Sequence, residues 1–169
     1  MNGATVTSTH GLGFLPTDWQ VQGADDFNAD GRSDIVWRNT TTGEVHLWQM
    51  NGGTVSSAAG VTLLPTIWQI QGMGDFNGDG RSDLVWRNTS TGEVHLWQMN
   101  GATVTSATGV TLLPLAWQIQ DTADFNGDGK TDLVWRDTNS GEIQVWQMNG
   151  STISSAQTPA IIPTEWVIS

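Results

Sequence analysis

Short stretches of alternating apolar and polar residues run along the whole chain, separated by turn-forming sequences. In WQIQ at residues 68–71, the tryptophan and isoleucine fall on one face and the two glutamines on the other, as in a half-buried β-strand. A continuous apolar run follows at residues 82–87, and further strand-like stretches lie at 93–99 and, more weakly, at 102–106. No long stretch has a 3.6-residue period, so the sequence predicts an all-β fold with essentially no helix.

The sequences between these stretches favour tight turns. NTSTG at residues 88–92 has a turn composition, and Asn100-Gly101 is a strong signal for a hairpin. Pro65 and Pro114 each follow a Leu-Leu pair and should end a strand, because proline cannot donate a hydrogen bond within a central strand. Successive strands are therefore expected to form antiparallel hairpins.

The same pattern repeats every 49 residues, as shown by the MNG-type sequences that begin at Met1, Met50, Met99 and Met148. Stretches such as TGEVHLWQMNG recur almost unchanged, so the copies share an origin, either by recent duplication or by design. The chain is therefore expected to be a single repeat domain over residues 1–169, with units at approximately 1–49, 50–98 and 99–147 and a partial unit at 148–169.

Four strands in each repeat of this length predict the blade of a β-propeller. The strand at residues 82–87 is apolar on both faces, which suits a strand packed between neighbouring blades. The glutamine face of the strand at 68–71 suits a wet central channel. A β-solenoid is the alternative fold, but its repeats are usually shorter and contain fewer hairpin turns.

Three blades are too few to close a ring, since propellers typically have about four to eight. Along the chain, one outer strand precedes the three complete blades and one inner strand follows them. These end strands cannot bury their faces alone, and open sheet edges favour pairing. We therefore expect a homo-oligomer, a dimer or trimer that completes the ring, or else a fragment of a longer repeat array.

Composition and charge exclude several classes of partner. The formal net charge of −11 repels phosphate backbones, so nucleic acid is not expected as a partner. The chain lacks an apolar run long enough to span a bilayer, so no membrane insertion is expected. It also lacks a basic segment followed by an apolar one, so no signal peptide is expected in this chain. Without cysteine there is neither a disulfide nor a thiolate metal site.

An acidic loop, DFNGDGRSD at residues 75–83, lies between the first two strands of the predicted blade and has copies that begin at Asp26 and Asp124. Oxygen-bearing side chains occupy positions 1, 3, 5 and 9, glycine occupies position 6, and position 7 offers its backbone carbonyl, as in an EF-hand calcium loop. Because position 12 is tryptophan instead of glutamate, the loop is not an EF-hand, and the aspartate at position 9 must close the site.

Electrostatics favour a bound cation over the alternative, a metal-free turn. Three carboxylates within nine residues repel one another unless a cation lies between them. Nine of the 13 aspartates belong to the three loops. About three calcium ions (Ca²⁺) per chain would change the formal net charge from −11 to −5, so such sites would account for much of the acidity.

The sequence WQIQGMGDFNGDGRSDLVW at residues 68–86 resembles the FG-GAP or VCBS-type repeat, and the resemblance covers nearly the whole chain. That family implies β-propellers, such as the head of the integrin α-subunit, with a Ca²⁺ loop between the first two strands of a blade. It also implies mostly secreted or cell-surface proteins that act in adhesion, carbohydrate binding or scaffolding. It does not imply an enzyme.

By this resemblance, each loop supplies three aspartate side chains, one asparagine side chain and one backbone carbonyl as Ca²⁺ ligands. The sets are Asp26, Asn28, Asp30, the Arg32 carbonyl and Asp34; Asp75, Asn77, Asp79, the Arg81 carbonyl and Asp83; and Asp124, Asn126, Asp128, the Lys130 carbonyl and Asp132. Ala29 replaces a glycine of the other loops at a position that supplies no ligand, so little effect is expected.

A catalytic site is not expected. The only histidines are His10, His46 and His95, and the third unit has Gln144 where two of the units have histidine. A repeated site that needed this histidine would be lost in one unit, so His46 and His95 are interpreted as surface residues of a strand. No glycine-rich phosphate loop of the Walker type occurs.

The ten tryptophans fall into three sets at equivalent positions of the repeat. Trp37, Trp86 and Trp135 are expected to pack between blades, and Trp19, Trp68, Trp117 and Trp166 to join the core. The third set either packs in the core or forms a platform on which a sugar stacks; it consists of Trp48, Trp97 and Trp146. Three arginines are expected to pair with glutamates across a hairpin, in the pairs Arg38–Glu44, Arg87–Glu93 and Arg136–Glu142.

These patterns favour a non-enzymatic, calcium-stabilised β-propeller that acts as a binding or scaffold module, from a secreted or cell-surface protein, with a glycan or a protein as possible ligand. One alternative is a carbohydrate-binding lectin. Another is a designed or reconstructed repeat protein that self-assembles and has no ligand beyond metal. The weak Ca²⁺ affinity common in extracellular modules, with Kd of about 10⁻⁴–10⁻³ M, favours an extracellular location.

Overall fold

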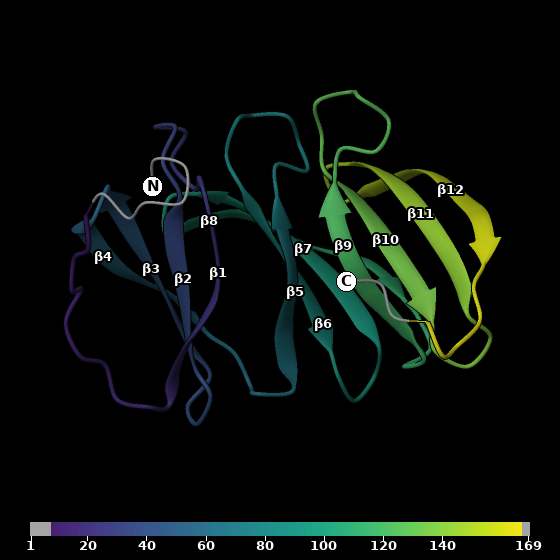
Figure 1. The fold of residues 1–169 in the computed structure, drawn as a ribbon, viewed down its shortest axis with the longest axis horizontal. Coiled ribbons are helices and arrows are strands. Elements are labelled where there is room, and N and C mark those ends of the chain that lie inside the picture. Colours follow the sequence, from purple (N-terminus) through teal and green to yellow (C-terminus); the bar gives the residue numbers. More distant parts are fainter. Residues whose placement is uncertain (1–7, 167–169) are drawn as a thin grey trace.

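Three four-stranded antiparallel sheets make up the fold (Figure 1), and the computed structural model describes residues 8–166. The first sheet contains β1 (Trp19–Asp25), β2 (Asp34–Asn39), β3 (Glu44–Asn51) and β4 (Thr54–Leu63). The second contains β5 (Trp68–Gly74), β6 (Asp83–Asn88), β7 (Glu93–Asn100) and β8 (Thr103–Leu112). The third contains β9 (Trp117–Ala123), β10 (Asp132–Asp137), β11 (Glu142–Asn149) and β12 (Thr152–Ile161).

Each sheet pairs its strands in chain order and corresponds to one predicted blade. This arrangement confirms the all-β class and the blades of four antiparallel strands. The blades span residues 19–63, 68–112 and 117–161, so each begins at the inner strand and not at the MNG sequence. The extra end strands expected from the repeat fall mainly on residues 1–7 and 167–169, outside the described residues. Between residues 8 and 166 there is no long apolar helix of the kind that crosses a membrane.

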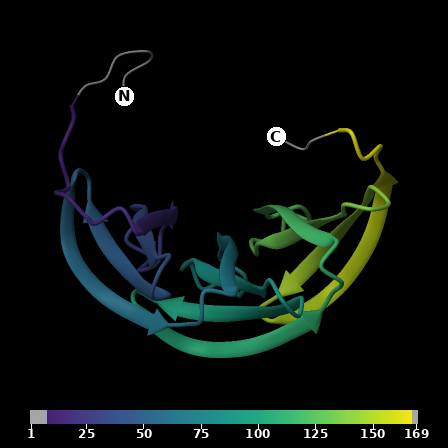
Figure 2. The same ribbon diagram turned by 90° about the horizontal axis from the view of Figure 1, so that it is seen from below.

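The blades stand side by side in an open arc (Figure 2), with the inner strands on the concave side and the outer strands on the convex side. Two clusters of buried side chains join them, one between the first and second blades and one between the second and third. Trp86 and Trp135 are fully buried in these clusters, whereas Trp37, on the free face of the first blade, is only half-buried. The cores of this protein therefore lie between its sheets.

The turn between the second and third strands shows why its sequence is NTSTG. Asn88 Oδ1 accepts hydrogen bonds from the N–H groups of Ser90 and Thr91, at 2.9 and 3.0 Å. Gly92 follows with a φ of 83°, and a Cβ there would collide with the Leu113 carbonyl oxygen of the linker to the next blade. Glycine is required here both for its backbone conformation and for this close approach.

The expected arginine–glutamate pairs are wrong. Arg87 Nη2 donates to the carbonyl oxygens of Leu113 and Pro114, at 3.4 and 2.9 Å, and the guanidinium lies 5.2 Å from the ring centre of Trp135 in the next blade. Arg38 makes the equivalent contacts. The arginine is buried between the linker and the neighbouring blade, whereas Glu93 is half-buried and accepts a hydrogen bond from the Thr91 hydroxyl.

Polar cavities lie between the inner strands of neighbouring blades. One, of about 360 Å³, is lined by glutamines of β1 and β5 together with Arg38, Thr40 and Thr66. Its equivalent between the second and third blades, of about 340 Å³, is lined in the same way around Arg87. The concave side is thus polar, as the glutamine face of the inner strand predicted.

Candidate metal centre

The three acidic loops join the first and second strands of their blades and project from the same rim of the arc, the upper edge in Figure 1. Each loop passes twice through the left-handed backbone region. In the second loop, Gly78 and Gly80 have φ values of 79° and 82°. In the first loop Ala29 takes the place of Gly78 and still adopts a φ of 62°. Two left-handed residues give the loop its tight curl.

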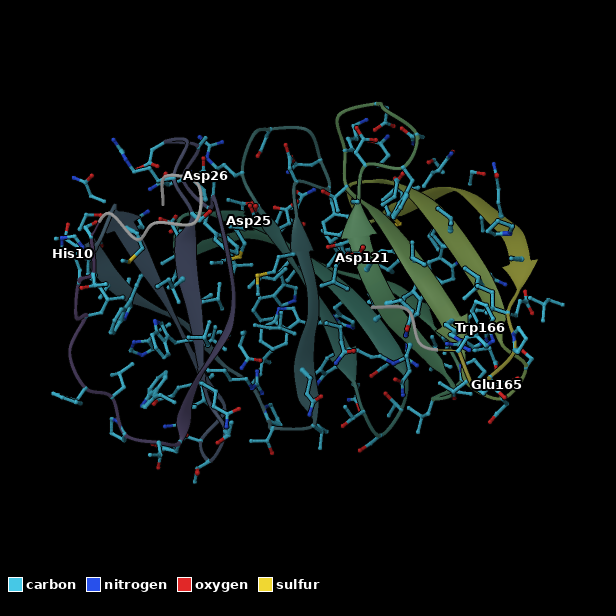
Figure 3. The ribbon with its side chains drawn as sticks, viewed as in Figure 1. His10, Asp25, Asp26, Asp121, Glu165 and Trp166 are labelled. Atoms are coloured by element: carbon cyan, nitrogen blue, oxygen red, sulfur yellow. The ribbon has the colours of Figure 1, made fainter. Side chains whose placement is uncertain are left out.

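The first aspartate of each loop organises the backbone around its carboxylate. Asp75 Oδ1 accepts the N–H groups of Gly78 and Asp79, at 2.7 and 3.1 Å, and Oδ2 accepts the Gly80 N–H at 2.7 Å. Asp124 accepts the equivalent hydrogen bonds. Asp26, which lies at the start of its loop in Figure 3, accepts those from Asp30 and Gly31 and a further one from the Asn28 N–H. The loop is therefore wound around a negative charge by its own sequence.

The third and fifth positions are turned inward by the same kind of bond. Asn77 Oδ1 accepts the Asp79 N–H at 2.8 Å, and Asp79 Oδ1 accepts the Arg81 N–H at 2.9 Å. The side-chain amide of Asn77 donates to Asp79 Oδ2 at 3.3 Å. Side-chain oxygens at positions 1, 3 and 5 thus all accept hydrogen bonds from backbone N–H groups of the same loop. The first and third loops repeat these contacts, with Arg32 and Lys130 at position 7 donating to Asp30 and Asp128.

The aspartate at position 9 is buried and ties the loop to the rest of its blade. Asp83 Oδ2 accepts the Phe76 N–H of the loop at 3.3 Å, and Oδ1 accepts the Met99 N–H of β7 at 3.0 Å. Asp34 and Asp132 make the same two bonds. The sequence predicted a metal ligand here but gave no sign of this link to the third strand, which spans 16 residues.

Burial and hydrogen bonding move the pKa values of these carboxyl groups in opposite directions. Burial raises the pKa of Asp83 to about 7 against the lowering effect of the Met99 and Phe76 N–H groups, and the charges of Asp79 and Asp75 raise it further. At Asp124, the Gly129 N–H is the largest influence and the pKa is lowered. In the first loop the two directions occur together, because burial raises the pKa of Asp34, whereas at Asp26 burial is outweighed by bonds to backbone N–H groups, which lower the pKa.

The donor set fits a hard divalent cation such as Ca²⁺, which prefers carboxylate, amide and carbonyl oxygens. Each carboxylate oxygen that accepts one N–H keeps a second lone pair for a cation. In residues 8–166 no three histidine or acidic side chains already converge as a metal cluster. Two loops instead have an arginine beside the fifth position: Arg32 Nη1 lies 3.3 Å from Asp30 Oδ2, and Arg81 Nη1 lies 3.7 Å from Asp79 Oδ2.

The tryptophans considered as a sugar platform pack against the tryptophans of the second strands. Trp97 lies 5.2 Å from Trp86 between ring centres, and Trp146 lies 5.1 Å from Trp135. Trp146 is buried, and its indole N–H donates to Gln144 Oε1 at 2.9 Å. Trp48 packs on Trp37 in the same way.

An apolar cavity of about 320 Å³ nevertheless lies beside Trp97, and the sequence gave no sign of it. Leu64, Trp68, Trp86, His95, Trp97 and Ala107 line it. His95 packs edge-on against Trp68, with ring centres 4.7 Å apart, so it is part of this cavity and not a freely exposed strand residue. The first blade has a smaller equivalent, of about 140 Å³, lined by Leu15, Trp19, Trp37, His46 and Trp48.

Comparisons with solved structures identify similar folds. A chain of the Photorhabdus luminescens Tc holotoxin pore is 20% identical, with a TM-score of 0.59 over 88% of this chain. A calcium-binding protein of Agrobacterium tumefaciens, regucalcin, is 10% identical, with a TM-score of 0.49 over 85% of this chain. This chain spans only 7% and 47% of the lengths of those two chains. At these identities the toxin likeness concerns the fold alone. No curated protein sequence matches.

Residues 75–135 match the family described as FG-GAP-like repeat. The matched segment begins at the acidic loop of the second blade and ends in β10 of the third blade, so it covers more than one full period of the repeat. It includes the loops that begin at Asp75 and Asp124, whose spacing carried the resemblance. Residues 75–135 of the chain are therefore similar to the FG-GAP-like repeat.

Proposed function

We propose that this chain is a non-enzymatic propeller module that Ca²⁺ stabilises and that serves in binding or scaffolding. The observation that carries the proposal is the geometry shared by the three loops. In each loop, oxygens at positions 1, 3 and 5 accept backbone N–H groups of the loop, and the aspartate of position 9 is buried. When bound, Ca²⁺ would supply the positive charge that neutralises these carboxylates.

The loops are well placed to pass the free energy of ion binding to the fold. Asp83 begins β6 and bonds to both the loop and β7, so anything that fixes its carboxylate also fixes the junction of the loop with these two strands. A ligand that binds only the folded state stabilises that state by an amount that grows with ligand concentration. Calcium should therefore raise the melting temperature of the chain in a concentration-dependent way.

Calorimetry with and without calcium tests the proposal. We expect about three ions per chain in a titration, a higher Tm in millimolar Ca²⁺ than in EDTA, and a weaker effect of Mg²⁺, which demands stricter geometry. Asp79→Asn should reduce the number of ions bound. Asp121→Asn, which removes an exposed carboxylate outside the loops, is the matched control. Unchanged Tm in EDTA, together with no heat of binding, would exclude the role of calcium.

An extracellular or cell-surface setting follows from the same proposal. Extracellular calcium modules with this type of ligand set often bind with Kd of about 10⁻⁴–10⁻³ M. Sites of that affinity fill only where calcium is abundant. A measured Kd in the low nanomolar range would instead suit a cytosolic buffer and would argue against this setting.

The cavity beside Trp97 supports a second candidate function, carbohydrate binding. Indole rings can stack on the apolar face of a sugar, and the half-buried imidazole of His95 can bond to a hydroxyl group. The third blade has Gln144 in place of this histidine, and Gln144 bonds to Glu142 and Trp146, so the same site in that blade would lack the imidazole.

A glycan array followed by titration of any hit tests this candidate. His95→Gln reproduces the residue that the third blade already tolerates, so it should keep the fold. We expect it to weaken binding of a hit at least tenfold, whereas His10→Gln should have no effect. An array without hits, or a hit whose affinity His95→Gln does not change, would remove the second blade cavity as a sugar site.

A further inference from the structure

The two interfaces between blades are built from the same contacts, repeated at the 49-residue spacing of the sequence. The Phe27 carbonyl of the first blade accepts the Gly101 N–H of the second at 2.7 Å, and the Phe76 carbonyl of the second accepts the Gly150 N–H of the third at 2.7 Å. Each blade therefore offers an acceptor at this position on one face and a donor on the other.

A second pair of backbone groups joins the acidic loops of neighbouring blades. The Asp26 carbonyl accepts the Ser82 N–H at 2.8 Å, and the Asp75 carbonyl accepts the Thr131 N–H at 2.7 Å. An arginine and a tryptophan complete the set, because Arg38 lies 5.1 Å from the ring centre of Trp86 and Arg87 lies 5.2 Å from that of Trp135. In each interface, the earlier blade again supplies the carbonyl and the arginine, and the later blade supplies the N–H group and the tryptophan.

The free face of the third blade, here called the tail face, carries the groups that each of the other blades presents to the blade after it. The tail face consists of the Asp124 and Phe125 carbonyls, the Phe125 side chain and Arg136. Within residues 8–166, neither carbonyl has a hydrogen-bond donor. Arg136 is buried and donates to the carbonyl oxygens of Pro163 and Trp166, but it lies over no tryptophan. Phe125 is 50% exposed, whereas its equivalents Phe27 and Phe76 are fully buried.

The free face of the first blade, here called the head face, carries the groups that each of the other blades presents to the blade before it. It consists of the Ser33 and Gly52 N–H groups, Val21 and Trp37. In the described part of the chain, neither N–H has an acceptor and no arginine lies over Trp37. Val21 is 54% exposed, while its equivalent in the second blade, Ile70, is half-buried against the first blade.

We propose that the tail face of one copy of this chain docks on the head face of a second copy, and that two copies close a single ring. The missing partner of Arg136 is a second-strand tryptophan with a free face, which Trp37 supplies. The missing acceptors of Ser33 and Gly52 are the Asp124 and Phe125 carbonyls. Two backbone donors therefore match two backbone acceptors, and an arginine matches a tryptophan, in the arrangement already present twice within the chain.

The arc and the blade number favour two copies over more. Both free faces lie at the open side of the arc (Figure 2), so a second copy turned by half a revolution about the ring axis would meet both at once. A head-to-tail interface of this kind closes into a ring if the rotation allows it. Two copies of three blades give six blades, within the usual range of about four to eight, whereas three copies would exceed it.

Light scattering on the 169-residue chain tests the ring directly. The expected mass is that of two chains, twice 18.2 kDa, over a range of protein concentrations. A single species of 18.2 kDa at all concentrations would overturn the proposal. A series of larger masses that grows with concentration would overturn the closed ring, because it would mean open head-to-tail polymers.

The absence of cysteine allows a test of which surfaces meet. A Cβ on Gly72 of the second blade would lie 3.9 Å from the Cβ of Thr122 in the third blade, a separation that suits a disulfide. Asp121 occupies in the third blade the position that Gly72 has in the second, and Ala24 occupies in the first blade the position that Thr122 has in the third. The equivalent pair between two copies is therefore Asp121 of one copy and Ala24 of the next; Figure 3 shows Asp121 on β9. Ala24→Cys with Asp121→Cys should therefore give a disulfide-linked pair of chains on mild oxidation.

A matched pair of cysteines provides the control. Ala24→Cys with Leu112→Cys has the same number of thiols, but Leu112 lies on the outer strand of the middle blade and is 63% exposed. This variant should remain one chain under the same oxidation. Equal cross-linking of the two variants, or none in the first, would show that head and tail faces do not meet.

Charge placed on the tail face should separate the copies. Phe125→Asp adds a carboxylate at a side chain that is half exposed in the single chain and fully buried in an interface. We expect one-chain particles with an unchanged circular dichroism spectrum. Leu112→Asp, equally exposed but outside both faces, should leave two-chain particles. If both variants keep the mass of two chains, the tail face is not the contact.

Discussion

Asp83 joins three parts of its blade through one carboxylate. Its oxygens accept the N–H groups of Phe76 and Met99 in a fully buried position. Removal of the carboxylate would leave two buried donors without a partner, and each such donor costs about 1–3 kcal/mol. The spacing of the acidic loop predicted that Asp83 matters but not this reason, because the partner in β7 lies on another strand.

Asp83→Ala should therefore lower the free energy of unfolding by about 2–5 kcal/mol even in EDTA. Chemical denaturation of the two proteins measures the difference. Asp79→Ala is the control, since that side chain is exposed and its loss in EDTA should cost far less. Equal losses for the two variants would mean that the buried hydrogen bonds contribute nothing.

Ala29 holds a backbone conformation that its side chain disfavours. Its φ of 62° matches the 79° and 77° of Gly78 and Gly127 in the other loops, so the fold imposes the conformation on whichever residue is present. A non-glycine residue in the left-handed region costs about 1 kcal/mol or more. The expectation of little effect at this position considered only metal ligands and not the backbone.

Ala29→Gly should stabilise the chain by about 0.5–1 kcal/mol, because it removes this strain. Gly78→Ala is the mirror experiment and should destabilise by a similar amount. Both changes are measured by thermal or chemical unfolding at fixed calcium concentration. A loss of stability in Ala29→Gly would contradict the strained conformation.

The strands differ in how well they could be predicted from their sequences. The second strand, continuously apolar, and the third, alternating, were predicted near their observed positions because burial imposes those patterns. The fourth strand was predicted as short and weak, yet β8 runs for ten residues and is the longest of its blade. It is mostly exposed and rich in Thr, Ser and Ala, so its hydrogen bonds to β7 and not its side chains define its length.

Arg87 shows where local patterns fail between elements. A glutamate across the hairpin looked like its natural partner, but the arginine reaches a linker 27 residues away and a tryptophan 48 residues away in the sequence. These contacts depend on how the blades pack together. The sequence of a single strand or hairpin does not reveal that packing. The planar guanidinium suits both contacts, whereas a lysine ammonium would suit neither as well.

Arg87→Lys should thus cost about 1–3 kcal/mol in the free energy of unfolding, through lost carbonyl bonds and the lost stack on Trp135. Glu93→Gln is the control and should change stability by less than about 0.5 kcal/mol, as is usual for a surface site. A loss of stability in Glu93→Gln as large as that in Arg87→Lys would support the Arg87–Glu93 ion pair expected from the sequence and contradict the contacts seen in the structure.

At the scale of the whole molecule, stability depends on neighbours. In repeat proteins each unit contacts only the units beside it, so the middle unit has two interfaces and the end units one each. The burial of the second strands follows this rule: β6 is buried at every position, while β2 and β10 are not. The sequence predicted the arc and its open ends, since both follow from the number of repeats.

Hydrogen exchange should report this difference. In the Phe125→Asp variant, as a single chain, amides of β6 should exchange more slowly than those of β2 and β10. In the unaltered chain, if it forms the ring, the three strands should be protected alike. Equal protection in the variant, or unequal protection in a confirmed two-chain ring, would contradict the dependence on neighbours.

The backbone bonds between acidic loops have a consequence for how the repeat can vary. The Asp75 carboxylate winds its own loop, while the Asp75 carbonyl holds Thr131 of the next loop. The three loops are therefore linked in series along one rim, and the middle loop bonds to both of its neighbours. A substitution in one loop must therefore preserve both the fold of that loop and its backbone bond to the loop of the following blade. We expect substitutions in neighbouring loops to occur together.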